Sequence, residues 1–277
     1  MQRVLLNHNK FHYYLSLSSL YPHAIRPHVN FIVACFDLNL ENYNHNEGGK
    51  MMRKIKILIA LSMLGMIASP LGLAQQGTDE PMSFFITSVD GGDGANLGGL
   101  AGADAHCQAL ASVVGSSDKT WHAYLSTQGA NAVNARDRIG TGPWYGQLGH
   151  MVARDLAHLH GDTIEVARTG NAVNPFHART EAGDIVIGVI DGIITGEPNR
   201  HDIMTGSTAD GRAYRDDDDH TCSNWTSGDE GSAQLGHHDS VGAQASSWNS
   251  DHPSRGCDQQ SLINTGGAGL FYCFAID

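Results

Sequence analysis

Four cysteines in the C-terminal part of this 277-residue chain restrict its fold more than any other feature. They are Cys107, Cys222, Cys257 and Cys273, and a fifth, Cys35, lies far upstream. No two form the CxxC pair that is typical of a zinc knuckle, so we expect two disulfide bonds. Four cysteines allow three connectivities, and their spacing alone does not choose among them.

An export signal explains why the chain has a fifth cysteine, Cys35, in addition to the four that we expect to pair. Residues 51–74 have a basic start, an apolar run over 57–67 and small residues before Gln75, which are the three parts of a signal peptide. The run is shorter than the about 20 apolar residues that usually span a bilayer, so cleavage is favoured over a retained membrane anchor. Cleavage removes Cys35. We expect a secreted, periplasmic or cell-envelope protein whose only contact with a membrane is through the cleaved signal.

The segment before this signal is expected not to belong to the protein. A cleavable signal works at the N-terminus of a nascent chain, and residues 1–50 show no clear helical or strand periodicity. The stretch 47–50 can be encoded by a purine-rich run containing AGGAGG, which resembles a bacterial ribosome-binding site. We therefore expect a bacterial chain with an untranslated extension over 1–50, a signal peptide over 51–74, a linker over 75–82 and one domain over 83–277.

The charge of the chain excludes several partners. It carries 29 acidic against 17 basic residues, a formal net charge of -12. Seven of the basic residues but only three of the acidic ones lie before Gln75, so the remaining chain is more acidic than the whole. Such a surface repels phosphate backbones and sulfated sugars, which argues against nucleic acid and heparin-type polyanions. Cations, neutral glycans and basic protein surfaces remain as partners.

Short periodic segments separated by long loops indicate an α+β domain. The patterns predict three strands and two helices: strands over 83–89, 121–126 and 269–276, and helices over 102–114 and 130–139. Residues from 140 to 221 are mostly a Gly-, Asp- and Asn-rich loop. If the first and last strands pair, Cys107 comes near Cys273, which leaves Cys222 for Cys257.

Several short motifs resemble the endostatin-type branch of the C-type lectin-like fold. The residues that carry the resemblance are Gly98 to Cys107 (GGLAGADAHC), Trp121 to Ser126 (WHAYLS), Thr205 to Ser207 (TGS), Cys222 to Ser227 (CSNWTS), Gly256-Cys257 and Tyr272 to Phe274 (YCF). The resemblance covers residues 83–277. It implies an α+β fold with short antiparallel sheets, two helices, long loops and two nested disulfides, Cys107 with Cys273 and Cys222 with Cys257.

Two properties of endostatin do not carry over to this chain. Endostatin binds heparin through an arginine-rich face, whereas the arginines here are scattered in an acidic background. Its zinc site uses an N-terminal histidine cluster, and residues 75–84 contain no histidine. The resemblance therefore implies a fold and leaves the ligand open.

A calcium site of the lectin type is one candidate. Calcium-dependent lectins use a Glu-Pro-Asn loop and a Trp-Asn-Asp strand, and this chain offers Glu197 and Asn199 in the first pattern and Asn249 in the second. Their oxygens suit Ca²⁺. Ser250 replaces the acid of the second pattern and Asp251 is displaced by one position. The competing interpretation is that Pro198 shapes a turn and Trp248 belongs to the core.

Two further groups are candidate metal ligands. The acidic run contributes Asp216, Asp218 and Asp219, whose mutual repulsion a divalent cation would relieve, although such runs usually face water. His237 and His238, with His220, His252 and neighbouring acids, suit zinc or copper. Adjacent histidines cannot both point one way on a strand, so local hydrogen bonding competes with that interpretation.

The chain contains no recognised catalytic motif. It has no GxSxG elbow, no HExxH and no P-loop, and disulfides would occupy the four cysteines. Trp144 and Tyr145 lie in a glycine-rich loop where an aromatic pair can stack on a sugar or a protein, or else plug the loop.

We therefore expect a non-catalytic module that binds a glycan or an extracellular or envelope protein through loops between about 140 and 255. Calcium is the candidate cofactor of such a module. The alternatives are a secreted zinc- or copper-dependent enzyme, and an envelope interaction or structural protein without a small ligand.

Overall fold

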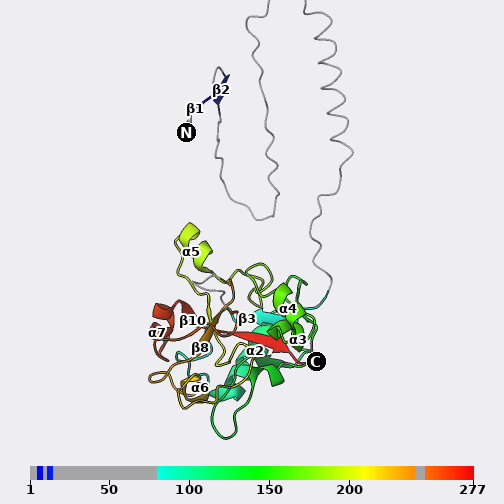
Figure 1. Cartoon of the computed structure of the whole chain (residues 1–277), viewed down its shortest axis with the longest axis vertical. Coiled ribbons are helices and arrows are strands. Elements are labelled where there is room, and N and C mark those ends of the chain that lie inside the picture. Colours follow the sequence, from blue (N-terminus) through cyan, green and yellow to red (C-terminus); the bar gives the residue numbers. More distant parts are fainter. Residues whose placement is uncertain (1–4, 9–10, 15–79, 241–246) are drawn as a thin grey trace, which may run out of the picture. The chain divides into compact units, whose positions relative to one another are not determined.

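The computed structural model describes residues 5–8, 11–14, 80–240 and 247–277, and the chain divides into units over 1–72 and 73–277 (Figure 1). The described part of the first unit is an antiparallel hairpin of β1 (Leu5–His8) and β2 (Phe11–Tyr14). The proposed signal peptide over 51–74 and the linker up to residue 79 lie outside the described residues, as does most of the proposed extension over 1–50.

The second unit is built on one mixed sheet with the strand order β3-β10-β7-β8-β9, in which β4 also pairs with β10. The strands are β3 (Phe84–Ile86), β4 (Trp121–Ala123), β7 (Asp202–Met204), β8 (Gln234–His237), β9 (His252–Pro253) and β10 (Gly267–Ala275). The pairing of β10 with β7 is parallel and the other pairings are antiparallel. The first and last predicted strands do pair, with Phe85 opposite Cys273.

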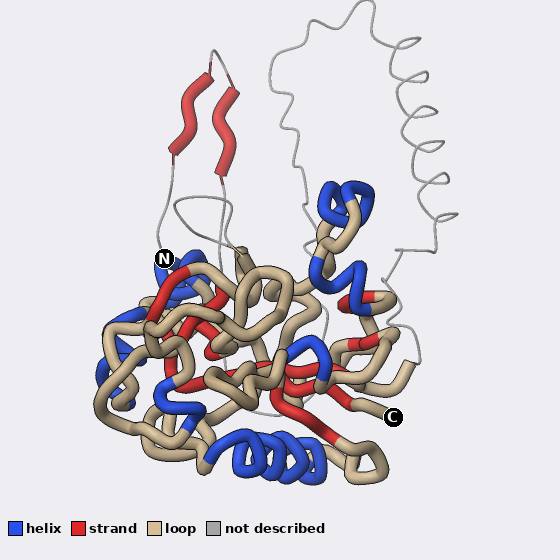
Figure 2. The backbone as a smooth tube through the Cα atoms, turned by 60° about the horizontal axis from the view of Figure 1, so that its bottom comes forward, coloured by secondary structure: helices blue, strands red, loops and turns tan. Residues whose placement is uncertain are grey.

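Helices and one small hairpin surround this sheet (Figure 2). They are α2 (Gly99–Val113), α3 (Leu156–His160), α4 (Ile164–Thr169), α5 (Val189–Thr195), α6 (Cys222–Trp225), α7 (Gln259–Thr265), and the pair β5 (Trp144–Tyr145) with β6 (Met151–Ala153). None of these helices in the described residues has the length and hydropathy to cross a bilayer.

The α+β class is therefore confirmed, and two details were wrong. The described residues form six α-helices where two were expected, because short loop segments close single turns once side chains cap them; Asp155 and Thr163, for example, cap α3 and α4. The helix expected over 130–139 is a loop with one 3₁₀ turn, Ala135–Asp137, because the side chains of Ser126 and Thr127 hold its backbone.

The core lies on both faces of the sheet because side chains of β10 alternate between them. Phe271 and Cys273 enter one apolar cluster with Trp121 and Trp225, while Tyr272 and Phe274 enter a second cluster with Phe84, Tyr124 and Trp144 on the other face. Aromatic rings in the second cluster contact one another edge on, as Phe84 does with Phe274 at 4.9 Å.

Both expected disulfides are present. Cys107 of α2 bonds to Cys273 of β10, and Cys222 bonds to Cys257. Their sequence separations are 166 and 35 residues, so the second pair is nested within the first. All four cysteines are fully buried.

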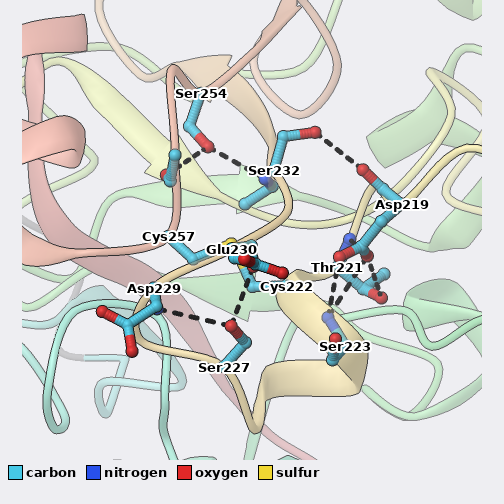
Figure 3. The surroundings of a disulfide bond; sticks show 12 residues. Asp219, Thr221, Cys222, Ser223, Ser227, Asp229, Glu230, Ser232, Ser254 and Cys257 are labelled. Atoms are coloured by element: carbon cyan, nitrogen blue, oxygen red, sulfur yellow. Dashed lines mark hydrogen bonds between the residues drawn. A yellow bond between two sulfur atoms is a disulfide. The ribbon is translucent and has the colours of Figure 1, made fainter.

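A left-handed turn lies beside the inner disulfide (Figure 3). Four consecutive residues that are not glycine, Cys222 to Trp225, have φ between 46° and 66°, a region that costs about 1 to 2 kcal/mol per residue. The carboxylate of Asp219 accepts hydrogen bonds from the backbone N–H groups of Thr221 at 2.9 Å and Ser223 at 3.0 Å. The disulfide and the Asp219 carboxylate together hold this turn.

Removing the two disulfides separately should destabilise the domain unequally. In the chain-entropy model the longer loop of Cys107–Cys273 contributes about 1.4 kcal/mol more than that of Cys222–Cys257. We expect the double variant C107A/C273A to have the lower free energy of unfolding in urea. The variant C222A/C257A is the matched control, since it removes two equally buried sulfur atoms, and equal or reversed losses would contradict the expectation.

Candidate metal centre

Five ionisable side chains meet where β7, β8 and β9 lie next to one another. His201 and Asp202 come from the start of β7, His237 ends β8, and Asp251 and His252 enter β9. The register places Asp202 opposite His237. His252 pairs with Leu235, two residues before His237, so its side chain reaches the same group diagonally. We call these five residues the metal centre.

The ligand atoms of the metal centre form two groups whose members lie within 4.8 Å of one another, His201–Asp202–His237 and His237–Asp251–His252, and the two groups share His237. The Nε2 atoms of His201 and His237 both lie 3.1 Å from Oδ1 of Asp202, and that of His252 lies 3.6 Å away. The Nε2 atoms of His237 and His252 are 2.9 Å apart, and Oδ2 of Asp251 is 3.5 Å from Nε2 of His237. Ligands about 2.0 to 2.1 Å from a tetrahedral zinc ion are about 3.3 to 3.4 Å from one another. The observed spacings bracket that value.

The metal centre has a buried half and an exposed half. The side chains of Asp202, His237 and His201 are 0, 5 and 9 % exposed, whereas those of Asp251 and His252 are 24 and 37 % exposed. Neither carboxylate oxygen of Asp202 accepts a hydrogen bond of good geometry from the described residues. A fully buried carboxylate needs compensating positive charge.

The electrostatics of the metal centre favour positive charge. Burial alone would lower the pKa of His201, yet Asp202 and Asp239 raise it to about 9. Burial alone would raise the pKa of Asp202, yet His201 and His237 lower it to about 2. The carboxylates therefore stabilise positive charge in this cluster, whether it is carried by a protonated imidazole or by a divalent ion.

Neighbouring groups orient the imidazole rings. Nδ1 of His201 lies 3.0 Å from Oδ1 of Asp239, and Nδ1 of His252 lies 3.1 Å from the carbonyl oxygen of Pro253. Each Nδ1–H can donate to its oxygen, which leaves the Nε2 lone pair for an ion. The arrangement of carboxylate, histidine and metal is the usual one for ligating histidines.

Two glycines make room for the buried carboxylate. A Cβ on Gly266, whose φ is 135°, would lie 3.0 Å from Oδ2 of Asp202, and a Cβ on Gly267 would lie 2.8 Å from its backbone oxygen. The sequence predicts this glycine pair only as the turn before the last strand. In the fold the two glycines also pack directly against Asp202.

Imidazole and carboxylate donors select a transition ion. Each group offers two imidazole nitrogens and one carboxylate, donors that suit zinc, copper or nickel, whereas Ca²⁺ takes six to eight oxygen ligands. The donor set therefore fits zinc better than the calcium expected from the lectin resemblance.

The structure sorts the predicted metal ligands into three groups. His237 and Asp251 lie in the metal centre, and their role as ligands stays a prediction. His238 is not among them: it follows the end of β8 and is fully buried, and burial lowers its pKa to about 4. Its ring nitrogens have no hydrogen-bond partner among the described residues.

The acidic run makes local contacts in the described structure. Oδ1 of Asp216 contacts Nε2 of His220 at 2.9 Å, and Asp218 is exposed. The carboxylate of Asp219 holds the left-handed turn instead. The assignment of Asp216, Asp218 and Asp219 as metal ligands stays a prediction, although Asp219 is already used in forming the turn.

The residues of the predicted calcium site are not gathered around one point. Glu197 is exposed, and Oδ1 of Asn199 accepts from the backbone N–H of His201 at 3.1 Å. The Asn249 amide is fully buried and donates to Oη of Tyr124 at 2.9 Å. Asn249 is thus a structural residue of the core, and Asn199 acts by positioning a histidine of the metal centre.

The aromatic pair divides between core and surface. Trp144 is buried, packs edge on against Phe274 at 5.3 Å and donates to the carbonyl of Ile139, which favours the alternative that it plugs the loop; stacking on a ligand stays a prediction. Tyr145 is half-buried beside a hollow of about 380 Å³ that Lys119 and Asp277 also line.

Sequence reasoning missed His201 and Asp202. The short apolar run that follows them indicated a strand, but a His-Asp pair at its start carries no signal by itself. Only the pairing of β7 with β8, across more than thirty residues of chain, brings the pair to His237.

Comparisons with known proteins add no identity. Neither the search against protein-family models nor the search of curated proteins found a match for this sequence.

A buried histidine outside the metal centre gives the fold a measurable pH dependence. Nδ1 of His160 contacts the carbonyl of Leu156, so Nε2 can accept from Tyr124 Oη at 2.8 Å. Burial lowers the pKa of His160 from 6.5 to about 4. The unfolded chain therefore binds a proton between these pH values that the folded chain does not.

We expect stability to be unaffected by His160 above pH 6.5 and to fall as the pH drops towards 4. The slope should approach about 1.4 kcal/mol per pH unit. The variant H160Q keeps an acceptor for Tyr124 but does not titrate, so urea unfolding across this range should show a shallower slope. Parallel slopes would contradict this account of His160.

Proposed function

We propose that this chain is an exported, non-catalytic binding domain that holds one divalent transition-metal ion, preferably zinc, at the metal centre. The observation that carries the proposal is the convergence of three imidazole Nε2 atoms on the buried Asp202 carboxylate at 3.1, 3.1 and 3.6 Å. Two of those imidazoles also have the outer hydrogen bonds that orient metal ligands.

The exposed half of the metal centre is where a ligand would meet the ion. Asp251 and His252 form its solvent side, while His201, Asp202 and His237 lie beneath. The acidity of the chain favours a neutral glycan or a basic protein surface as that ligand. A glycan array run with and without chelator separates these two classes, and chelator-sensitive glycan binding supports the first.

Zinc should bind with an affinity that depends on Asp202. We expect D202N to weaken binding by at least about 100-fold in calorimetry, because the neutral amide leaves the buried imidazoles and the ion without a countercharge. In the unchanged protein, zinc at 100 times its dissociation constant should stabilise the fold by about 2.7 kcal/mol. Calcium should stabilise it much less.

The matched control is D216N, which removes an acidic group outside the metal centre. It should bind zinc as the unchanged protein does. If D202N binds zinc as tightly as D216N, or if calcium binds more tightly than zinc, the proposed function is wrong.

One observation favours a zinc hydrolase as the second candidate. Asp251 is partly exposed and its Oδ2 lies 3.5 Å from Nε2 of His237, a position from which a carboxylate can take a proton from a metal-bound water. Hydrolysis of activated esters or peptides that D251N abolishes, while zinc binding persists, would favour this candidate over the binding domain.

A further inference from the structure

Asp239 links the metal centre to a helix on the surface. Its Oδ1 lies 3.0 Å from Nδ1 of His201, and its Oδ2 accepts a hydrogen bond from the backbone N–H of Val189 at 2.9 Å. Val189 is the first residue of α5. The Asp239 side chain is only 3 % exposed, so both contacts are made in a low-dielectric environment.

Helix α5 depends on this end for its position. It projects from the domain in Figure 1, and none of its residues is buried. Ile193 and Ile194 are each 76 % exposed. Side-chain packing therefore holds α5 only weakly. Two hydrogen bonds at its ends fix its position instead: that from Val189 N–H to Asp239, and that from Arg200 N–H, after the helix, to the carbonyl of Ile187, before it, at 2.8 Å.

Glycine at position 188 permits the close approach of Asp239. A Cβ at this position would lie 2.6 Å from Oδ2 of Asp239, 3.2 Å from its Cγ and 3.1 Å from its Cβ. The backbone φ of Gly188 is -87°, which any residue adopts, so the requirement for glycine comes from this contact alone. A side chain at this position would meet the Asp239 side chain first and displace its carboxylate.

We propose that Asp239 couples the metal centre to α5, so that the ion binds more tightly when α5 is in place, and α5 is held more firmly when the ion is bound. An ion on Nε2 of His201 fixes the plane of the imidazole, the ring fixes the Asp239 carboxylate, and its second oxygen fixes the start of α5. The two effects are equal in free energy because coupling between two events is reciprocal. This inference rests on the proposed function.

The variant G188A tests the coupling from the helix side. We expect it to weaken zinc binding by about tenfold, at the lower end of the effect of losing an outer hydrogen bond to a ligating histidine. The visible spectrum of the cobalt-substituted protein should shift at saturating cobalt, because the orientation of His201 changes while every ligand remains. A loss of stability alone would not move that spectrum.

The matched control is I193A, which alters an exposed side chain of the same helix. It should leave zinc affinity and the cobalt spectrum unchanged. If G188A matches I193A in both measurements, the coupling is wrong while zinc binding stands. If the unchanged protein binds no zinc, the proposed function fails and the coupling with it.

Hydrogen exchange tests the coupling from the metal side. We expect saturating zinc to slow exchange of the α5 amides by about fivefold in the unchanged protein, the size of one capping interaction. The amides of α7, which is capped by Asp258 away from the metal centre, should change much less. The α5 effect should disappear in D239N at saturating zinc, and its absence from the unchanged protein would overturn the proposal.

Discussion

The strand β10 is the constraint on which the rest of the domain depends. It pairs with β3 on one edge and with β4 and β7 on the other, and its side chains enter apolar clusters on both faces. Cys273, near its end, fixes it covalently to α2. The parallel pairing of β10 with β7 then carries β8 and β9 into the same sheet. The metal centre exists because this pairing places Asp202 beside His237.

The buried Asp202 carboxylate gives the metal centre its chemical character. Moving a carboxylate out of water costs several kcal/mol unless positive charge accompanies it. Three imidazole nitrogens surround it, and Gly266 and Gly267 leave it space rather than a hydrogen-bond donor. A core that only needed stability would place an apolar side chain at this position. Protonation of His201, whose pKa is raised to about 9, supplies that positive charge, and the ion proposed above would supply it instead.

Local patterns predicted the framework of this fold well. The terminal strands, the helix that carries Cys107 and both disulfides follow from apolar periodicity, from cysteine number and from the lectin-like motifs. The metal centre could be predicted only in part, through His237, His252 and Asp251. His201 and Asp202 lie at the start of a strand of three residues, whose register depends on long-range pairing that a sequence does not encode locally. Motif reasoning also assigned function to Asn249 and Asp219, which the fold uses for internal hydrogen bonds.

The distribution of the metal centre over three strands determines when an ion can bind. His201, His237 and His252 come together only after β7, β8 and β9 have paired, so an extended chain offers an ion isolated side chains and no site. The sheet itself depends on β10, and therefore on the order in which the ends of the domain meet. The ion proposed for this site would therefore be taken up only after the sheet has formed.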